Sequence, residues 1–148
     1  MSTRRLALLF IFLIGAAGGA TLVARTDTVP AAARIAPETA FAAAQAGKRL
    51  LIDLRTPAEW RETGVATNAV TLDFNASGGG TSFVGQVLAL VDGDRSRPVA
   101  LICARGNRSG RAWRLLHDAG FGDVKDVAEG MLGNDLGPGW LGRGLPTT

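Results

Sequence analysis

Cys103 is the only cysteine of this 148-residue chain, and its neighbours suit the chemistry of a reactive thiol. The apolar run Val99–Ile102 ends on it, Arg105 and Arg108 follow in a short loop, and Ser109 opens a helical pattern. Two guanidinium groups and the start of a helix favour the thiolate over the thiol, because each places positive charge beside the sulfur. The segment therefore predicts a nucleophilic cysteine in an anion-binding loop; the alternative is an inert, buried thiol.

The loop between Cys103 and Ser109 is short enough to wrap around a small anion. Gly106 permits the left-handed backbone that a tight turn from strand to helix needs. Consecutive backbone N–H groups in such a turn point inward as a cradle, and the start of the helix adds further N–H groups and its positive dipole end. We predict Cys103 as the nucleophile, and we predict that the residues after it bind the anion: Ala104, Arg105, Gly106, Asn107, Arg108 and Ser109.

The N-terminal segment has a different character from the rest of the chain. Leu6–Ala24 contains no charged residue and follows Arg4 and Arg5, a pattern typical of a secretory signal. An apolar run of this length would also serve as an uncleaved membrane anchor. We therefore expect a signal peptide or membrane anchor at 1–24, a linker at 25–34 and one domain at 35–148. The protein would be exported, periplasmic or extracytoplasmic, with anchoring through 6–24 as the alternative.

Composition excludes several classes of partner. The sequence pI is about 10.0, but two of the basic residues, Arg4 and Arg5, belong to the predicted leader, and no basic stripe interleaved with aromatic residues follows. We therefore expect no nucleic-acid partner. One cysteine and one histidine cannot supply a metal-ligand set, so we expect neither a metal nor another cofactor. We expect the domain to be a monomer.

Beyond the leader, the hydrophobic pattern alternates between helix and strand. It predicts helices at 37–46, 57–64, 83–90 and 109–119, and strands at 49–54, 69–72, 98–103 and 123–127. This alternation is typical of a parallel α/β sheet with right-handed crossovers. The almost wholly apolar strand at 98–103 would lie centrally, covered on both faces. Ligands bind such sheets at the carboxyl ends of strands, which is where Cys103 would stand.

The pattern also predicts helix caps and the course of the C-terminal tail. Thr56 and Glu59 have the spacing of a capping box, and Ser82 would cap the helix at 83–90. Asp53, Arg55 and Glu59 are expected to form a structural ion pair and a cap rather than to act as catalytic acids. The Gly-rich tail after residue 130 would lie over the domain, held by Leu136, Trp140 and Leu141.

Several of these segments resemble one family. The pattern Cys-x-x-Gly-x-Arg-Ser at 103–109, followed by a helix, resembles the active-site loop of single-domain rhodaneses, which are sulfurtransferases. The segments at 53–60, 129–130 and 137–146 resemble other parts of that family, so the resemblance covers residues 35–146. The chain departs from the family at 64–69, which lacks a histidine and a second glycine, and at Gly130-Met131, which stands in place of a Gly-Gly pair.

The resemblance implies a rhodanese-like α/β fold, with a central parallel sheet and helices on both faces. It also implies that a sulfane sulfur passes from an anionic, thiosulfate-like donor to a thiol or cyanide through a persulfide on Cys103. Arg108 would orient the donor and Arg105 would steer it. One alternative is a non-catalytic rhodanese-like module that binds a partner. Another is a cysteine-loop phosphatase or arsenate reductase, which needs five residues between cysteine and arginine, whereas four stand here.

Overall fold

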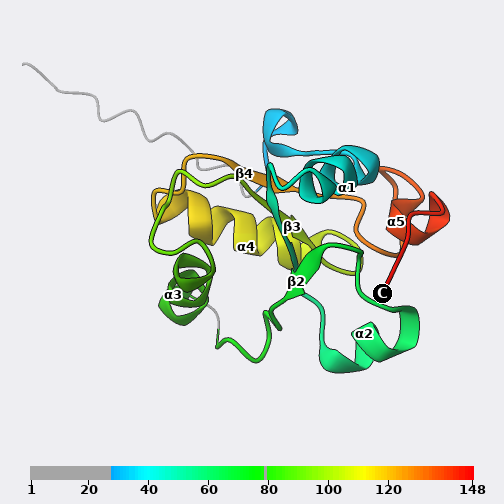
Figure 1. Ribbon diagram of the computed structural model, residues 1–148, viewed down its shortest axis with the longest axis horizontal. Helices are drawn as coiled ribbons and strands as arrows, with labels where there is room; N and C mark the ends of the chain where they lie inside the picture. The colour runs from blue at the N-terminus through cyan, green and yellow to red at the C-terminus, as the bar shows by residue number, and fades with distance from the viewer. Residues whose placement is uncertain (1–27, 79) are drawn as a thin grey trace, which may run out of the picture.

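Four parallel strands form one sheet in the part of the chain that the structure describes. The structure is a computed structural model that describes residues 28–78 and 80–148, so the predicted leader at 1–24 lies outside the described residues. The strands are β1 Leu50–Asp53, β2 Ala69–Thr71, β3 Val99–Ile102 and β4 Val124–Asp126, and their order in the sheet is β2-β1-β3-β4 (Figure 1). The predicted parallel sheet is confirmed, with the strand before Cys103 between β1 and β4.

Helices cover both faces of this sheet, as the resemblance implied. The helices are α1 Pro37–Gln45, α2 Pro57–Thr63, α3 Gly80–Leu90, α4 Asn107–Asp118 and α5 Gly139–Gly142, with a short 3-10 helix, η1, at Ala31–Ala33. Helices α1 and α5 pack on one face, and α3 and α4 pack on the other (Figure 1). Within the described residues, no helix is long and apolar enough to cross a membrane.

Strand β3 is apolar at every position because each face of the sheet has its own core. Val99 and Leu101 belong to the cluster built with α3 and α4, whereas Ala100 and Ile102 belong to the cluster built with α1 and α5. All four side chains are fully buried. Side chains alternate between the faces of a strand, so packing on both sides fixes the register of β3 and the position of the residue that follows it, Cys103.

The structure differs from the sequence prediction at two helix starts. Helix α3 begins at Gly80, so Ser82 lies inside its first turn and is not its cap. Helix α4 begins at Asn107 with Gly106 as its N-cap, two residues before the predicted start at Ser109. The Ser109 hydroxyl donates to the carbonyl oxygen of Gly106 and is therefore used inside the first turn. Composition alone did not distinguish a capping serine from one in the first turn.

The tail after residue 130 is held by Trp140 rather than by Leu136. Trp140 is fully buried, lies edge-on to Phe41 on α1, and donates from its indole N–H to the carbonyl oxygen of Pro146. Leu141 packs against the same core, as predicted. Leu136, which was also expected to hold the tail, is 56% exposed and is a correction to the prediction. It lies in a turn closed by hydrogen bonds between Asn134 and Gly137, which presents its side chain to solvent.

Several residues just before position 35 pack against the sheet. Val29 and Ala33, in the stretch expected to be a linker, are buried in the core with α3 and α4. The N–H of Ile35 donates to the carbonyl oxygen of Asp126, and Arg34 forms an isolated parallel bridge with Asp126. Residues 29–35 thus cover the outer edge of β4, which would otherwise leave unpaired backbone groups.

Glycines with positive φ stand at both ends of α4, but they differ in their surroundings. Gly106, before the helix, has a φ of +88°, and Gly120, after it, has a φ of +84°. A Cβ atom on Gly106 would overlap the carbonyl oxygen of Ala128, whereas a Cβ atom on Gly120 would meet nothing within 4 Å. The left-handed turn expected at Gly106 is confirmed, and a close approach of two backbones adds to the need for glycine there.

We predict that Gly106→Ala destabilises the protein more than Gly120→Ala does. Both substitutions place an alanine in the left-handed region, which costs about 1–2 kcal/mol. Only the alanine at 106 also pushes against Ala128, which adds about 1–3 kcal/mol of overpacking. Urea unfolding followed by tryptophan fluorescence measures the difference. Equal losses in the two variants would mean that the cysteine loop does not depend on its contact with Ala128.

Candidate active site

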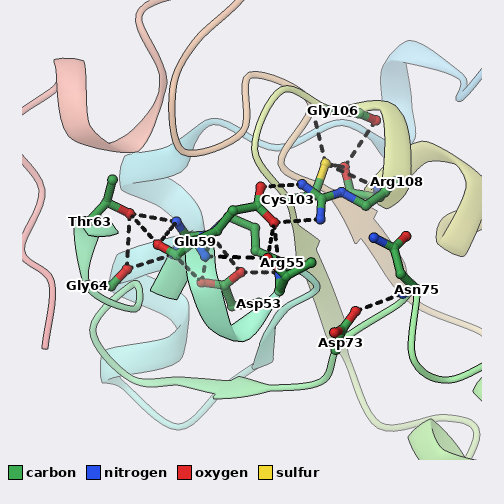
Figure 2. A network of polar contacts seen from close by, with 12 residues as sticks. Asp53, Arg55, Glu59, Thr63, Gly64, Asp73, Asn75, Cys103, Gly106 and Arg108 are labelled. Atoms are coloured by element: carbon green, nitrogen blue, oxygen red, sulfur yellow. Dashed lines mark hydrogen bonds and ion pairs between the residues drawn. The ribbon is translucent and has the colours of Figure 1, made fainter. Parts of the chain in front are cut away.

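The sulfur of Cys103 lies at the carboxyl end of β3 and receives hydrogen bonds from the loop that follows. Cys103 is 1% exposed. The backbone N–H of Gly106 donates to Sγ at 3.2 Å (Figure 2), and that of Ser109 donates at 3.4 Å. The Ser109 hydroxyl lies 3.5 Å from the sulfur. Hydrogen bonds from N–H groups stabilise the charged form of an acceptor, so this environment suits a thiolate or a persulfide anion.

The segment after β4 holds the cysteine loop through its backbone. The N–H groups of Met131 and Leu132 donate to the carbonyl oxygens of Cys103 and Ala104, at 2.8 and 2.9 Å. The side-chain amide of Asn134 donates to the carbonyl oxygen of Arg105 at 3.0 Å. These bonds occupy the loop's carbonyl groups, which leaves its N–H groups free to face the sulfur. Sequence reasoning missed Asn134, because an isolated polar residue in a Gly-rich tail carries no signal.

Arg108 is positioned by a carboxylate from another helix. Its two terminal nitrogens bind the two oxygens of Glu59 at 2.8 and 2.5 Å, in the bidentate arrangement that matches a guanidinium fork (Figure 2). Glu59 is in turn held by Thr56, so the capping box predicted at the start of α2 is confirmed. The Arg108 pair lowers the pKa of Glu59 to about 2. It raises the pKa of Arg108, and the charge on Cys103 contributes in the same direction.

Asp53 and Arg55 form the structural ion pair that the sequence predicted. Both side chains are almost fully buried, and the guanidinium binds the carboxylate at 2.7 Å. The remaining Arg55 donors reach the Thr63 hydroxyl and the Gly64 carbonyl oxygen, which ties the end of β1 to the end of α2 (Figure 2). All of these groups are satisfied by one another. Their contribution to the site is therefore to hold α2, and with it Glu59, in place.

The other residues predicted to bind an anion occupy different positions around the loop. Arg105 is exposed, and one of its terminal nitrogens donates to the carbonyl oxygen of Gly133 at 3.0 Å. Asn107 is exposed and Ala104 is half-buried. In the described part of the chain, the hydrogen bonds that reach the sulfur come from Gly106 and Ser109. The roles of Ala104, Arg105, Asn107 and Arg108 toward an anion remain predictions.

A cavity of about 430 Å³ lies against the same loop, lined in part by Gly106 and Asn107. It also includes Asp126, the last residue of β4, which is 2% exposed. Burial raises the pKa of Asp126 to about 6. Sequence reasoning did not single out this residue. No cluster of potential metal ligands occurs among residues 28–78 and 80–148.

The low pKa of Glu59 predicts a pH-dependent contribution to stability. The folded-state pKa of Glu59, about 2, lies below its ordinary value of 4.5, so the stabilisation is complete above pH 4.5 and is lost as the pH falls toward 2. We expect the free energy of unfolding to fall less steeply over this range in Glu59→Gln than in the wild type. Glutamine keeps the capping box but removes the charge pair with Arg108.

The matched control for this measurement is Glu62→Gln, an exposed position on the same helix for which the described residues provide no ion pair. Acid titration of stability, followed by circular dichroism, would then give a wild-type slope for the control and a shallower slope for Glu59→Gln. Identical slopes in all three proteins would show that the contact between Glu59 and Arg108 contributes nothing to the folded state.

Comparison with known proteins places this geometry in a family. Residues 37–133, more than half of the chain, match the family model described as "Rhodanese-like domain". A polysulfide-sulfur transferase homodimer from Wolinella succinogenes is 25% identical, with a TM-score of 0.58 over 82% of this chain and 79% of that one. A rhodanese-related protein from Thermoplasma volcanium is 24% identical, with a TM-score of 0.55 over 76% and 94% of the two chains.

A human single-domain sulfurtransferase is 16% identical, with a TM-score of 0.52 over 66% of this chain and 90% of that one. Among curated protein sequences there is no match. The family match includes β1, β3, the cysteine loop and β4, the elements that build the site around Cys103. The chain is therefore a member of the rhodanese family, with a single rhodanese-like domain.

Proposed function

We propose that this protein is a sulfurtransferase that carries a sulfane sulfur as a persulfide on Cys103. The observation that carries the proposal is the pair of backbone N–H groups, from Gly106 and Ser109, that donate to the sulfur at 3.2 and 3.4 Å. The loop carbonyls are bound by the segment after β4, so the donors stay in place when the sulfur changes its bonding. Membership of the rhodanese family supports the same activity.

The proposed reaction has two steps, and both are displacements at sulfur. The Cys103 thiolate attacks the outer sulfur of a thiosulfate-like donor, the S–S bond of the donor breaks, and sulfite leaves with the bonding electrons. The outer sulfur is now held in a persulfide. A thiol or cyanide then attacks that sulfur and restores the Cys103 thiolate. No metal or cofactor takes part.

A polysulfide is a second donor of the same chemistry. One relative of this chain is a polysulfide-sulfur transferase, which supports testing that class. Attack on the terminal sulfur of a polysulfide dianion forms the same persulfide and releases a polysulfide shorter by one sulfur. Thiosulfate and polysulfide are both anions, so the positive charge of Arg108 and Arg105 would favour either donor near the loop.

The two alternative functions, a partner-binding module and a phosphatase or arsenate reductase, explain fewer features of the site than sulfur transfer does. A non-catalytic module that binds a partner has no need of a thiol that receives two N–H donors at the end of a central strand. A phosphatase or arsenate reductase needs a wider cradle than the four residues between Cys103 and Arg108 provide.

The proposal extends to the cell compartment: the apolar segment 6–24 after two arginines supports export, and the enzyme would act outside the cytoplasm.

We predict that thiosulfate or polysulfide adds one sulfur atom to the purified domain and that Cys103→Ser abolishes the addition. Intact-protein mass spectrometry detects the added sulfur, and a later addition of cyanide or a small thiol should remove it. The variant changes one atom of a buried side chain, so circular dichroism should match that of the wild type. Absence of the added sulfur with both donors would contradict the proposed function.

We also predict that Arg108→Ala lowers kcat/KM for thiosulfate more than Arg111→Ala does, by roughly tenfold, equivalent to about 1.4 kcal/mol. Arg108 stands beside the loop in its pair with Glu59, whereas Arg111 is exposed, with its guanidinium over the ring of Phe74. A neutral electrophile, iodoacetamide, provides the control, because its reaction with Cys103 does not require an anion to bind. Equal losses of kcat/KM in the two arginine variants would show that Arg108 does not help to bind the anionic donor.

A further inference from the structure

The cavity beside the cysteine loop is rich in positive charge, and the sulfur transfer described above does not use it. Its volume, about 430 Å³, lies within the roughly 300–1,000 Å³ that small-molecule sites occupy. The described residues that line it do not include Cys103, so the cavity is distinct from the place where a sulfur donor would react. The arginines of its lining are Arg34 after η1, Arg105 in the loop, and Arg111 and Arg114 on α4.

Two of these arginines have donors to offer a ligand. Within the described residues, the exposed guanidinium of Arg34 forms no hydrogen bond or ion pair. Arg105 uses one terminal nitrogen to bind the Gly133 carbonyl oxygen at 3.0 Å, and a guanidinium carries five N–H donors in all. Arg111 instead holds its guanidinium over the ring of Phe74. We therefore expect Arg34 and Arg105 to make the direct contacts with an anion.

A buried carboxyl group lines the same cavity. Asp126 is 2% exposed, and its Oδ1 atom has no hydrogen-bond partner among the residues that the structure describes. Burial raises the pKa of this carboxyl to about 6, while the charges of Arg34 and Arg114 act in the opposite direction. A carboxylate without a partner is costly to bury, so this acceptor requires a hydrogen-bond donor that the described chain does not supply.

The space beside Asp126 is open because the position that faces it on α4 is a glycine. A Cβ atom on Gly110 would lie 3.4 Å from the Val29 side chain and 3.8 Å from Asp126 Oδ2. Both distances are ordinary van der Waals contacts, so an alanine would fit the helix. Its methyl group would occupy the space next to the carboxyl, which the native chain leaves unfilled.

These groups restrict the chemistry of a ligand. Four arginines and one carboxyl favour a ligand with a net negative charge, and the unpartnered oxygen requires that the ligand also donate a hydrogen bond. Arg34 and Asp126 are partners in a parallel bridge, and side chains at paired positions lie on the same face. The ligand must therefore present an acceptor and a donor within a few ångströms of each other, as a small protonated oxyanion does.

We propose that this cavity binds hydrogen phosphate, an oxyanion that still carries a proton. Its charged oxygens accept hydrogen bonds from Arg34 and Arg105, and its hydroxyl donates to the carboxylate of Asp126. Sulfate would meet the same arginines, but with no proton it would only repel the carboxylate. The inference goes beyond the proposed function, because it does not depend on the chemistry of Cys103.

The test compares three tetrahedral dianions by isothermal titration calorimetry of the purified protein. At about pH 8 inorganic phosphate keeps one proton, whereas methyl phosphate and sulfate keep none. We expect phosphate to bind roughly tenfold more tightly than either of the others, because it alone donates to Asp126. Methyl phosphate also distinguishes free phosphate from phosphate esters as the source of the ligand.

Variants of the carboxyl group test the origin of this selectivity. Asp126→Asn removes the anionic acceptor, so the ratio of the affinities for phosphate and sulfate should fall to about one. The matched control, Asp135→Asn, removes an exposed negative charge and should leave the ratio unchanged. Amide shifts of Gly110 in nitrogen-15 NMR should follow the same titration, which would locate the anion in the cavity.

Variants of the other lining residues test the contacts with the anion. Gly110→Ala should weaken phosphate binding roughly tenfold by filling the space beside the carboxyl. Arg34→Gln should weaken it to a similar extent, whereas Arg61→Gln, at an exposed position on α2, should not.

Equal affinities for phosphate and sulfate in the unsubstituted protein, or no binding of either anion, would overturn the proposal. So would a preference for phosphate that survives in Asp126→Asn. The comparison of anions needs no variant, so it remains decisive even where a substitution prevents folding. None of these measurements uses a sulfur donor, and failure of persulfide formation would therefore contradict the proposed function without affecting them.

Discussion

The backbone hydrogen bonds between the cysteine loop and the segment after β4 are the interaction on which the candidate site depends. They bind the carbonyl oxygens of Cys103 and Ala104, so the loop presents its N–H groups to the sulfur. Gly130 makes this approach possible, because a Cβ atom there would overlap the Ala104 carbonyl oxygen. Trp140 then anchors the same segment in the core under α1. The geometry at one thiol is thus set by chain far from it in sequence.

Two carboxyl groups, those of Glu59 and Asp126, lie near the cysteine loop, and their pKa values shift in opposite directions. Glu59 is paired with the fork of Arg108, and its pKa falls to about 2. Asp126 Oδ1 finds no hydrogen-bond partner among the residues that the structure describes, and burial raises the pKa of this carboxyl to about 6. The difference arises because a bidentate guanidinium compensates Glu59 for its lost hydration, whereas the charges of Arg34 and Arg114 lower the pKa of Asp126 by less than burial raises it. One group serves as a permanent charge that holds Arg108, and the other is able to exchange a proton.

Patterns with a local physical cause were predicted correctly from the sequence. The alternation of strands and helices, the central position of β3, the capping box of Thr56 and Glu59, and the left-handed turn at Gly106 all depend on near neighbours in the chain. The start of α4 and the exposure of Leu136 were predicted wrongly. A serine such as Ser109 suits both the cap and the first turn of a helix, and a leucine such as Leu136 is found both buried and exposed. Contacts with other segments decided between these positions.

By itself, the sequence determined that one thiol follows a buried strand, is flanked by arginines and precedes a helix, because strand burial and turn geometry are encoded in residue type and spacing. It did not determine which groups reach that thiol. Tertiary structure alone placed Glu59 against Arg108, the segment 128–134 against the loop carbonyls, and Asp126 in the lining of the same cavity as Gly106. The reason is physical: hydrogen bonds and charge pairs act over a few ångströms, and only the packing of sheet and helices brings these distant residues that close.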